Sequence, residues 1–235
     1  MIAAPPPVAL TATPAHVALA GAAVQSITVA NPGRSVAVVE ARPAGFALDL
    51  RGRPRIVVQR DRSIALSIAP RRFALAPGAW GTVLVAATIH RGARVGDHVG
   101  LVLFTTQPRG GAGVGVRMQV GVPVTVRVPG TVRRRVVFER IRLAKRMLEL
   151  RFHNVGNVTA TIGAHRFRVE LRRSGRVLAT LRVRRRELLP GARSVVGVRL
   201  PPRVRGRVRA IVDADDGAGG MLRRSLAVSR RPRDR

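Results

Sequence analysis

The sequence contains no cysteine and no tyrosine, and aromatic residues make up only 3% of its 235 residues. Without cysteine, the chain cannot form disulfides, carry out thiol catalysis or bind zinc through thiolates. Because aromatic side chains are scarce, valine, leucine, isoleucine and alanine have to fill any core. Hydrophobic residues reach 46% of the chain, which is enough for one large or two modest packed domains.

Acidic residues are also scarce, since 12 Asp and Glu stand against 43 Lys and Arg, and the formal net charge is +31. Lys145 is the only lysine, so the other 42 basic residues are arginines, a bias typical of a GC-rich genome. Arginine stays ionised and pairs bidentately with phosphate and carboxylate. The charge is concentrated in residues 131–235, which carry +21 against +10 for residues 1–130. We therefore expect the second half to attract anionic polymers.

No segment approaches the ~20 consecutive apolar residues of a membrane-spanning helix. Residues 1–24 are apolar, but they lack the basic n-region of a signal peptide and four prolines interrupt them, so they make a poor signal peptide. Two interpretations stay open: the chain functions in the cytoplasm, or it begins after a signal sequence.

Apolar and polar residues alternate with a period of two along most of the chain. Clear examples are Ile64–Ile68, Val114–Val122, Leu148–Phe152 and Phe167–Leu171. This pattern predicts antiparallel strands with one face in a core, and Pro-Gly and Asp-Gly turns separate the strands. Residues 138–148 also fit a helix, but we favour two strands with a turn at 144–146. The predicted fold class is all-β.

One set of strand and turn signals occurs twice in the same order. A strand is followed by Asn-x-Gly, and Leu-x-Pro-Gly-Ala comes later. The corner residues are Asn31, Gly33, Pro77 and Gly78 in the first copy, and Asn154, Gly156, Pro190 and Gly191 in the second. The repetition predicts two tandem immunoglobulin-like antiparallel β-sandwich domains, residues 1–130 and 131–235. We expect the two asparagines to shape the corners, because Asn side chains bond nearby backbone groups.

Longer strand-and-turn motifs point to a family. They are Ile27–Gly33, Ile68–Ile89, Gly96–Phe104 and Val120–Gly130 in the first domain, and Leu148–Ile162, Arg186–Gly191 and Arg205–Val212 in the second. Through them the chain resembles the WxL-interacting cell-surface proteins of Gram-positive bacteria. Its first domain also resembles, more distantly, periplasmic pilus chaperones. The resemblance implies an extracytoplasmic adhesive or scaffolding protein, whose first domain is associated with peptidoglycan and whose second domain binds a partner or host.

The sequence offers no convergent catalytic or metal-binding set. The five histidines form no metal-binding pair, and Asp97-His98 has no serine nucleophile motif nearby. The acidic run Asp213–Asp216 suits either a calcium loop or a hairpin turn, and we favour the turn. Gly110–Gly115 leads into a strand, which favours a hairpin tip over a phosphate loop. We expect no enzyme activity, no cofactor, no metal and no small-molecule substrate.

Two arginine clusters are candidate contacts for anionic polymers. They are Arg133, Arg134 and Arg135, and Arg182, Arg184 and Arg186. The second cluster alternates, so we expect it to form a basic stripe on one strand face. A solvated face explains both clusters equally well. The clusters lack interleaved aromatic residues, which argues against base-stacking recognition of nucleic acid.

These observations predict a non-enzymatic binding or scaffolding protein of the bacterial cell envelope, at the cell surface or secreted. Its expected partner is a cell-wall polymer or an envelope protein. Two alternatives stay open. One is a pilus-chaperone-like assembly factor for a secreted subunit, and the other is a protein that binds nucleic acid or other polyanions without specificity.

Overall fold

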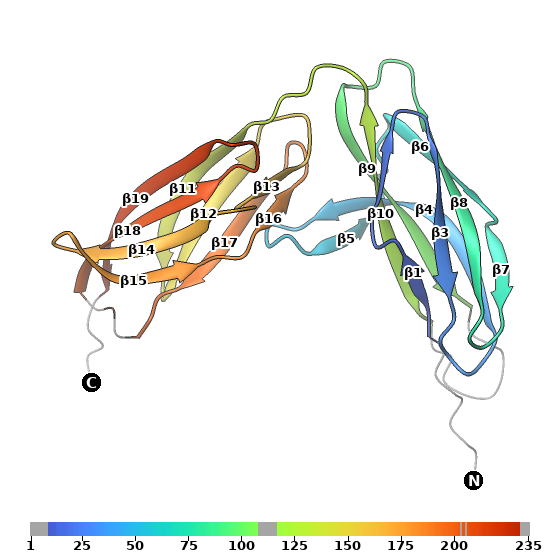
Figure 1. The fold of residues 1–235 in the computed structure, drawn as a ribbon, viewed down its shortest axis with the longest axis horizontal. Coiled ribbons are helices and arrows are strands. Elements are labelled where there is room, and N and C mark those ends of the chain that lie inside the picture. Colours follow the sequence, from blue (N-terminus) through green and yellow to red (C-terminus); the bar gives the residue numbers. More distant parts are fainter. Residues whose placement is uncertain (1–8, 108–116, 203, 205, 231–235) are drawn as a thin grey trace, which may run out of the picture. The chain divides into compact units, whose positions relative to one another are not determined.

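The computed structural model describes residues 9–107, 117–202, 204 and 206–230, and these residues form nineteen strands and no helix. The predicted all-β class is therefore confirmed (Figure 1). The chain divides into two compact units. Unit 1 comprises Met1–Ala47 and Arg55–Gly130, and unit 2 comprises Leu48–Pro54 and Thr131–Arg235. Within the described residues, no helix is long and apolar enough to cross a membrane.

Unit 1 contains two sheets. The first has the order β1 (Thr11–Thr13), β3 (Val24–Ala30), β8 (Trp80–Ile89) and β6 (Ile64–Ala69). The second has the order β2 (Val17–Ala20), β10 (Gln119–Val128), β9 (Gly96–Thr106), β4 (Ala37–Leu48) and β5 (Pro54–Val57), and β7 (Arg72–Leu75) also pairs with β4. The β2–β10 pair is parallel, whereas β9 pairs antiparallel with both β10 and β4.

The period-two alternation places one apolar face of each sheet in the core of unit 1. Ile27 on β3 and Val85 on β8 contribute from the first sheet, and Phe104 on β9 and Val124 on β10 contribute from the second. All four side chains are fully buried. Because residues from both sheets belong to one cluster, the sheets pack face to face as a β-sandwich.

Unit 2 is built in the same way from three sheets. One has the order β11 (Val136–Ala144), β12 (Met147–Asn154) and β17 (Arg193–Arg199), and a small one pairs β13 (Ala160–Ile162) with β16 (Arg186–Leu188). The third has the order β15 (Arg176–Arg182), β14 (Phe167–Arg173), β18 (Gly206–Asp215) and β19 (Met221–Arg230).

Three phenylalanines lie at the centre of the core of unit 2. The ring of Phe152 stacks on Phe138, with 4.6 Å between centroids, and meets Phe167 edge-on at 5.7 Å. Phe152 is fully buried. The ambiguous segment 138–148 forms the end of β11, a turn and the start of β12, as we favoured. Lys145 in that turn has a φ of 55°, a conformation that no helix contains.

Buried Asn31 joins two distant turns in unit 1. Its Nδ2 donates hydrogen bonds to the carbonyl oxygens of Ser35 at 2.8 Å and Leu75 at 3.0 Å. Its Oδ1 accepts the N–H of Gly33 at 3.1 Å, and its carbonyl accepts the N–H of Gly78 at 2.8 Å. Gly78 has a φ of +72°, which explains why glycine occupies this place in the Pro-Gly turn.

Buried Asn154 makes the corresponding bonds in unit 2. Its Nδ2 donates to the carbonyl oxygens of Val158 at 2.8 Å and Leu188 at 3.0 Å, and its Oδ1 accepts the N–H of Gly156 at 3.0 Å. Its carbonyl accepts the N–H of Gly191, whose φ is +70°, at 2.9 Å. The two corners therefore have the same hydrogen-bond pattern at matching sequence positions.

Some sequence-based expectations lie outside the described residues. The predicted hairpin tip at Gly110–Gly115 lies wholly outside them, as does the beginning of the predicted strand Val114–Val122. The last four residues of that predicted strand, 119–122, form the first part of β10.

Candidate functional site

Strand β10 is fully paired along one of its two sides and only partly paired along the other. On one side β9 pairs with its whole length, from Gln119 opposite Thr105 to Val128 opposite Gly96. On the other side β2 pairs only with Val124–Arg127. Among the strands that the structure describes, none pairs with that side of residues 119–123. We call this segment the open edge of β10, and it is the candidate functional site.

Two hydrogen bonds fix which backbone groups face the open edge. The N–H of Thr106 on β9 donates to the carbonyl of Met118 at 3.0 Å, so Met118 forms a bonded pair with β9. Further along, the N–H of Gly21 donates to the carbonyl of Arg127 at 2.9 Å, on the β2 side. Bonded pairs alternate along an antiparallel ladder, so even-numbered residues of β10 bond to β9 and odd-numbered residues face the other side.

The open edge therefore presents the backbone groups of Gln119, Gly121 and Pro123. The first two each offer an N–H donor and a carbonyl acceptor. Pro123 has no N–H, and proline is tolerated in a sheet only where no ladder partner needs that donor. Pro123 faces the side of β10 that β2 does not cover, so its missing N–H leaves no neighbouring strand without a donor. Unpaired edge groups of this kind are a template for another strand.

The side chains of the open edge alternate between the core and the outer face of the sheet. Val122 is fully buried, whereas Val120 packs against the core but stays half-buried. Gly121 faces outward, where a Cβ atom would lie 3.2 Å from Cδ1 of Leu101. The open edge thus has an apolar side chain on its core side, at Val120, and no side chain on its outer side at Gly121.

Asp97 and His98 on β9 each have a separate partner, so they form no acid–base pair. Arg127 donates to the Asp97 carboxylate from Nε at 2.7 Å and from Nη2 at 3.1 Å, and this bond raises the pKa of Arg127. His98 Nδ1 lies 2.7 Å from Asp61 Oδ2. Burial acts to raise the pKa of Asp61, but the N–H of Ser63 and the His98 ring outweigh it and hold that pKa below its usual value.

The predicted cluster Arg133, Arg134 and Arg135 lies in the exposed segment that precedes β11. Its backbone is tied down, because the N–H of Arg133 donates to Oδ1 of Asn157 at 2.7 Å and the carbonyl of Arg135 accepts the N–H of Val155 at 2.9 Å. None of the three side chains has an ion pair with a described residue. Contact with anionic polymers stays a prediction for this cluster.

The expected basic stripe on one strand is wrong, because Arg182, Arg184 and Arg186 do not share a strand. Arg182 ends β15 opposite Arg168, whereas Arg186 begins β16 opposite Ile162 in another sheet. Arg184 lies in the connection between them. Residue alternation continues through this connection in the sequence, but the chain leaves one sheet there and enters the next.

The acidic run Asp213–Asp216 lies at the β18–β19 turn, and its carboxylates bind protein donors. Asp215 accepts backbone N–H groups of His165 and Arg166, at 3.1 and 2.6 Å, and Asp216 accepts that of Gly220 at 2.8 Å. No group of three or more His, Cys, Asp or Glu side chains suited to a metal occurs in the described part of the chain. These contacts agree with a hairpin turn.

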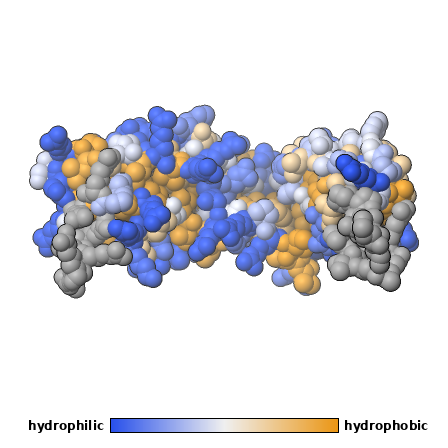
Figure 2. Space-filling model, turned by 90° about the horizontal axis from the view of Figure 1, so that it is seen from below, coloured by the Kyte–Doolittle hydropathy of each residue, from blue (hydrophilic) through white to orange (hydrophobic). Residues whose placement is uncertain are grey.

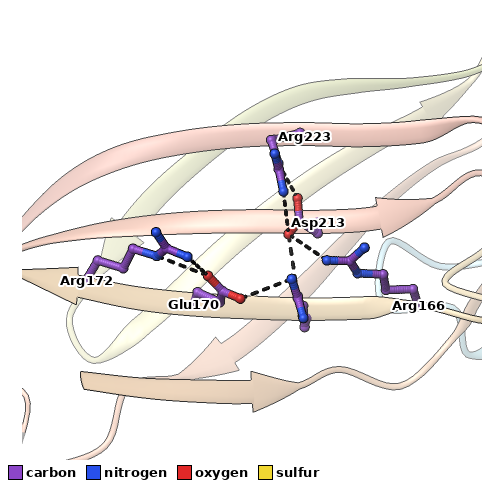
Figure 3. Close-up of polar contacts among 6 residues, drawn as sticks. Arg166, Glu170, Arg172, Asp213 and Arg223 are labelled. Atoms are coloured by element: carbon purple, nitrogen blue, oxygen red, sulfur yellow. Dashed lines mark hydrogen bonds and ion pairs between the residues drawn. The ribbon is translucent and has the colours of Figure 1, made fainter. Parts of the chain in front are cut away.

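Asp213 holds arginines from two neighbouring strands and a loop on the outer face of unit 2 (Figure 3). Its side chain, only 1% exposed, accepts bonds from Nε and Nη2 of Arg223 at 2.6 and 3.2 Å. Arg166 and Arg168 each approach it to 3.5 Å. The hydrogen bond from Arg223, followed by the nearby positive charges, lowers the pKa of Asp213 despite burial.

Glu170 organises a second pair of arginines on this face. Its carboxylate accepts bonds from Nη2 and Nε of Arg172 at 2.7 and 3.1 Å and pairs with Arg168 at 3.1 Å (Figure 3). The sequence analysis missed this network of Asp213, Glu170 and their arginines, because its members come from different strands and meet only through the sheet register.

Hydrophilic residues cover much of the molecular face drawn in Figure 2, with hydrophobic residues exposed between them.

No protein-family model matches the sequence, and no curated protein matches it either. The resemblance to WxL-interacting cell-surface proteins therefore gains no support from these comparisons.

Solved structures of pilus and fimbrial chaperones are similar to this chain. The Escherichia coli chaperone DraB has a TM-score of 0.51 and 15% identity, over 94% of this chain and 98% of that chain. The class 5 fimbriae chaperone CfaA has 0.54 and 10%, over 92% and 98%. A Salmonella enterica complex of the SafA pilin with the SafB chaperone has 0.50 and 12%, over 95% and 99%.

Each of these structures is named as a chaperone or a chaperone complex, and none is named as an enzyme. At such low sequence identities the likeness establishes the fold. This chain has the all-β, immunoglobulin-like fold of these chaperones.

Proposed function

We propose that this protein is a non-enzymatic, extracytoplasmic chaperone-like factor that binds a secreted protein subunit at the open edge of β10. The observation that carries the proposal is the edge itself, whose backbone groups pair with no described strand and lie beside a half-buried apolar residue. The fold supports it, because similar structures include a chaperone in complex with a pilin. A pilus-chaperone-like factor was an alternative expectation from the sequence.

Strand addition is the binding mode that this geometry suits. In that mode main-chain hydrogen bonds supply affinity, and pockets for alternate side chains supply specificity. The outward N–H and carbonyl groups of Gln119 and Gly121 would pair with the backbone of an incoming strand. Its apolar side chains would lie on the core side, where Val120 is only half-buried. A bound strand would therefore complete both the sheet and the core at this end.

We also propose that units 1 and 2 correspond to the predicted domains, residues 1–130 and 131–235, except that Leu48–Pro54 belongs to unit 2. A protein partner fits the expectation of an envelope protein as ligand. Binding to a cell-wall polymer gains no support from the comparisons, and we do not propose it for this protein.

A synthetic strand tests the proposal directly. The probe is a labelled, uncharged peptide in which valine alternates with serine, and the control has the same composition with its valines placed in adjacent pairs. Fluorescence anisotropy with the full chain should show saturable binding of the alternating peptide and at least about tenfold weaker binding of the control, which cannot place its valines on one side of a strand. Equal binding of the two peptides would show that strand addition is not the mode.

A further inference from the structure

We propose that the outer face of β14 and β18 in unit 2 holds a binding site for a phosphate group. A hollow of about 500 Å³ lies there, at the edge of the arginine network around Glu170. Of its eight lining residues, five are arginines and one is acidic. The site is separate from the open edge of β10, and the proposal does not depend on the proposed function.

Two arginines stand directly opposite each other across this hollow. The strand register pairs Arg172 on β14 with Arg209 on β18, and like charges at such positions repel. Glu170 neutralises Arg172 through two hydrogen bonds, at 2.7 and 3.1 Å. Arg209 is exposed, and its side chain has no hydrogen bond or ion pair with any residue that the structure describes. An anion between the two guanidinium groups would relieve their repulsion.

The buried carboxylates orient the arginines before any ligand arrives. Glu170 uses two of the five N–H donors of Arg172, and Asp213 uses Nε and Nη2 of Arg223. The remaining donors of both guanidinium groups are therefore held in place on the rim of the hollow. Binding to groups that are already ordered loses less conformational entropy, so an anion gains affinity here.

Phosphate fits this arrangement better than a carboxylate does. The lining arginines exceed Glu170 by four charges, and Asp213 beneath Arg223 offsets one more, so three positive charges remain. A phosphate monoester carries about −1.5 to −2 and three acceptor oxygens. It can therefore accept hydrogen bonds from the free donors of Arg172, Arg209 and Arg223, the lining arginine of β19 on this face, whereas a carboxylate has only two oxygens. The phosphate could be free or belong to a lipid headgroup.

Calorimetric titration with inorganic phosphate, at constant ionic strength, tests the site in the full chain. Arg209→Gln removes a guanidinium that has no partner within the described structure, so the fold should tolerate it. The matched control is Arg199→Gln, an exposed arginine on β17 that likewise lacks a described partner. We expect Arg209→Gln to weaken binding about tenfold or more, since it removes charged hydrogen bonds, and Arg199→Gln to change it less than about twofold.

Vesicles of phosphatidylcholine with and without phosphatidic acid, whose headgroup is a phosphate monoester, separate the two sources of phosphate. If the ligand is a headgroup, Arg209→Gln releases the protein from phosphatidic acid vesicles while Arg199→Gln does not. If it is free phosphate, the selective loss occurs only in calorimetry. Either selective loss supports the site. Equal weakening by both variants, or failure of the wild-type protein to bind either probe, overturns it.

Discussion

Replacing Asn154 by alanine tests whether the buried corner asparagines hold the sandwiches together. The Asn154 side chain is fully buried and makes three hydrogen bonds, to Val158, Leu188 and Gly156, at 2.8 to 3.0 Å. Alanine removes all three bonds. The N–H of Gly156 keeps the carbonyl of Arg135 as an acceptor, at 3.1 Å, but the carbonyl oxygens of Val158 and Leu188 lose their buried amide donor. We expect unit 2 to lose stability while unit 1 keeps its own.

The size of the effect follows from the number of bonds. Each buried hydrogen bond contributes about 1 kcal/mol net, and each backbone group left unpaired adds a further desolvation cost. The loss should therefore be at least about 3 kcal/mol. Since about 1 kcal/mol lowers the melting temperature of a domain of this size by about 4 °C or more, unit 2 should melt at least about 12 °C lower.

Pulsed hydrogen exchange with mass spectrometry, across a urea series, follows each unit through its own peptides. Asn157→Ala is the matched control, because Asn157 lies three residues away and its side chain bonds Arg133 and Thr131 at the exposed surface. Asn157→Ala should lower the free energy of unfolding of unit 2 by less than about 1 kcal/mol, since its exposed backbone partners can form hydrogen bonds with water instead. If Asn154→Ala costs no more than this control, the corner does not stabilise unit 2 as we reason.

Three further predictions concern the open edge, an ion pair and the core. Gln119→Pro removes an N–H that faces the open edge, so it should weaken binding of the alternating peptide about tenfold in anisotropy titrations. Gln119→Ala keeps that N–H and should change the affinity less than about twofold; equal losses of affinity would mean that the backbone is not involved. The pKa of Asp213 is lowered in the folded chain, so its stabilisation is present above the unfolded pKa of about 3.9 and is lost as pH falls below it. Urea unfolding from pH 6 to 2 should therefore show a flatter acid decline for Asp213→Asn, and parallel curves would contradict this. Phe152→Ala removes the ring between Phe138 and Phe167 and should cost unit 2 about 3–5 kcal/mol by the same exchange assay; a loss below about 1 kcal/mol would show that the core tolerates the cavity.

Strands and corners could be predicted from the sequence because their signals are local. Leu148, Leu150 and Phe152 alternate with polar residues, and all three are buried on β12. Asn31 and Asn154 each open an Asn-x-Gly corner at the end of a strand, and a Leu-x-Pro-Gly-Ala turn follows later in both copies. Alternation and turn residues depend only on neighbours in the sequence, so they can be recognised without knowing which strands pair with each other.

The candidate site could not be predicted, because it depends on which strands meet. Alternating valines marked β10 as a strand, but only the short pairing with β2 reveals the open edge. Asp213 and Arg168 are 45 positions apart and lie opposite each other solely through the β14–β18 register. The expected single strand through Arg182 and Arg186 failed for the same reason, since alternation does not show where a chain changes sheets.

Hydrogen exchange at the open edge tests the central claim most directly. The full chain would be saturated with the alternating peptide, and amide exchange would be measured residue by residue by NMR. Strand addition predicts slower exchange of the Gln119 and Gly121 N–H groups, with little change at β6, which is also an edge strand of unit 1. Unchanged exchange at both amides, or protection confined to β6, would contradict the account.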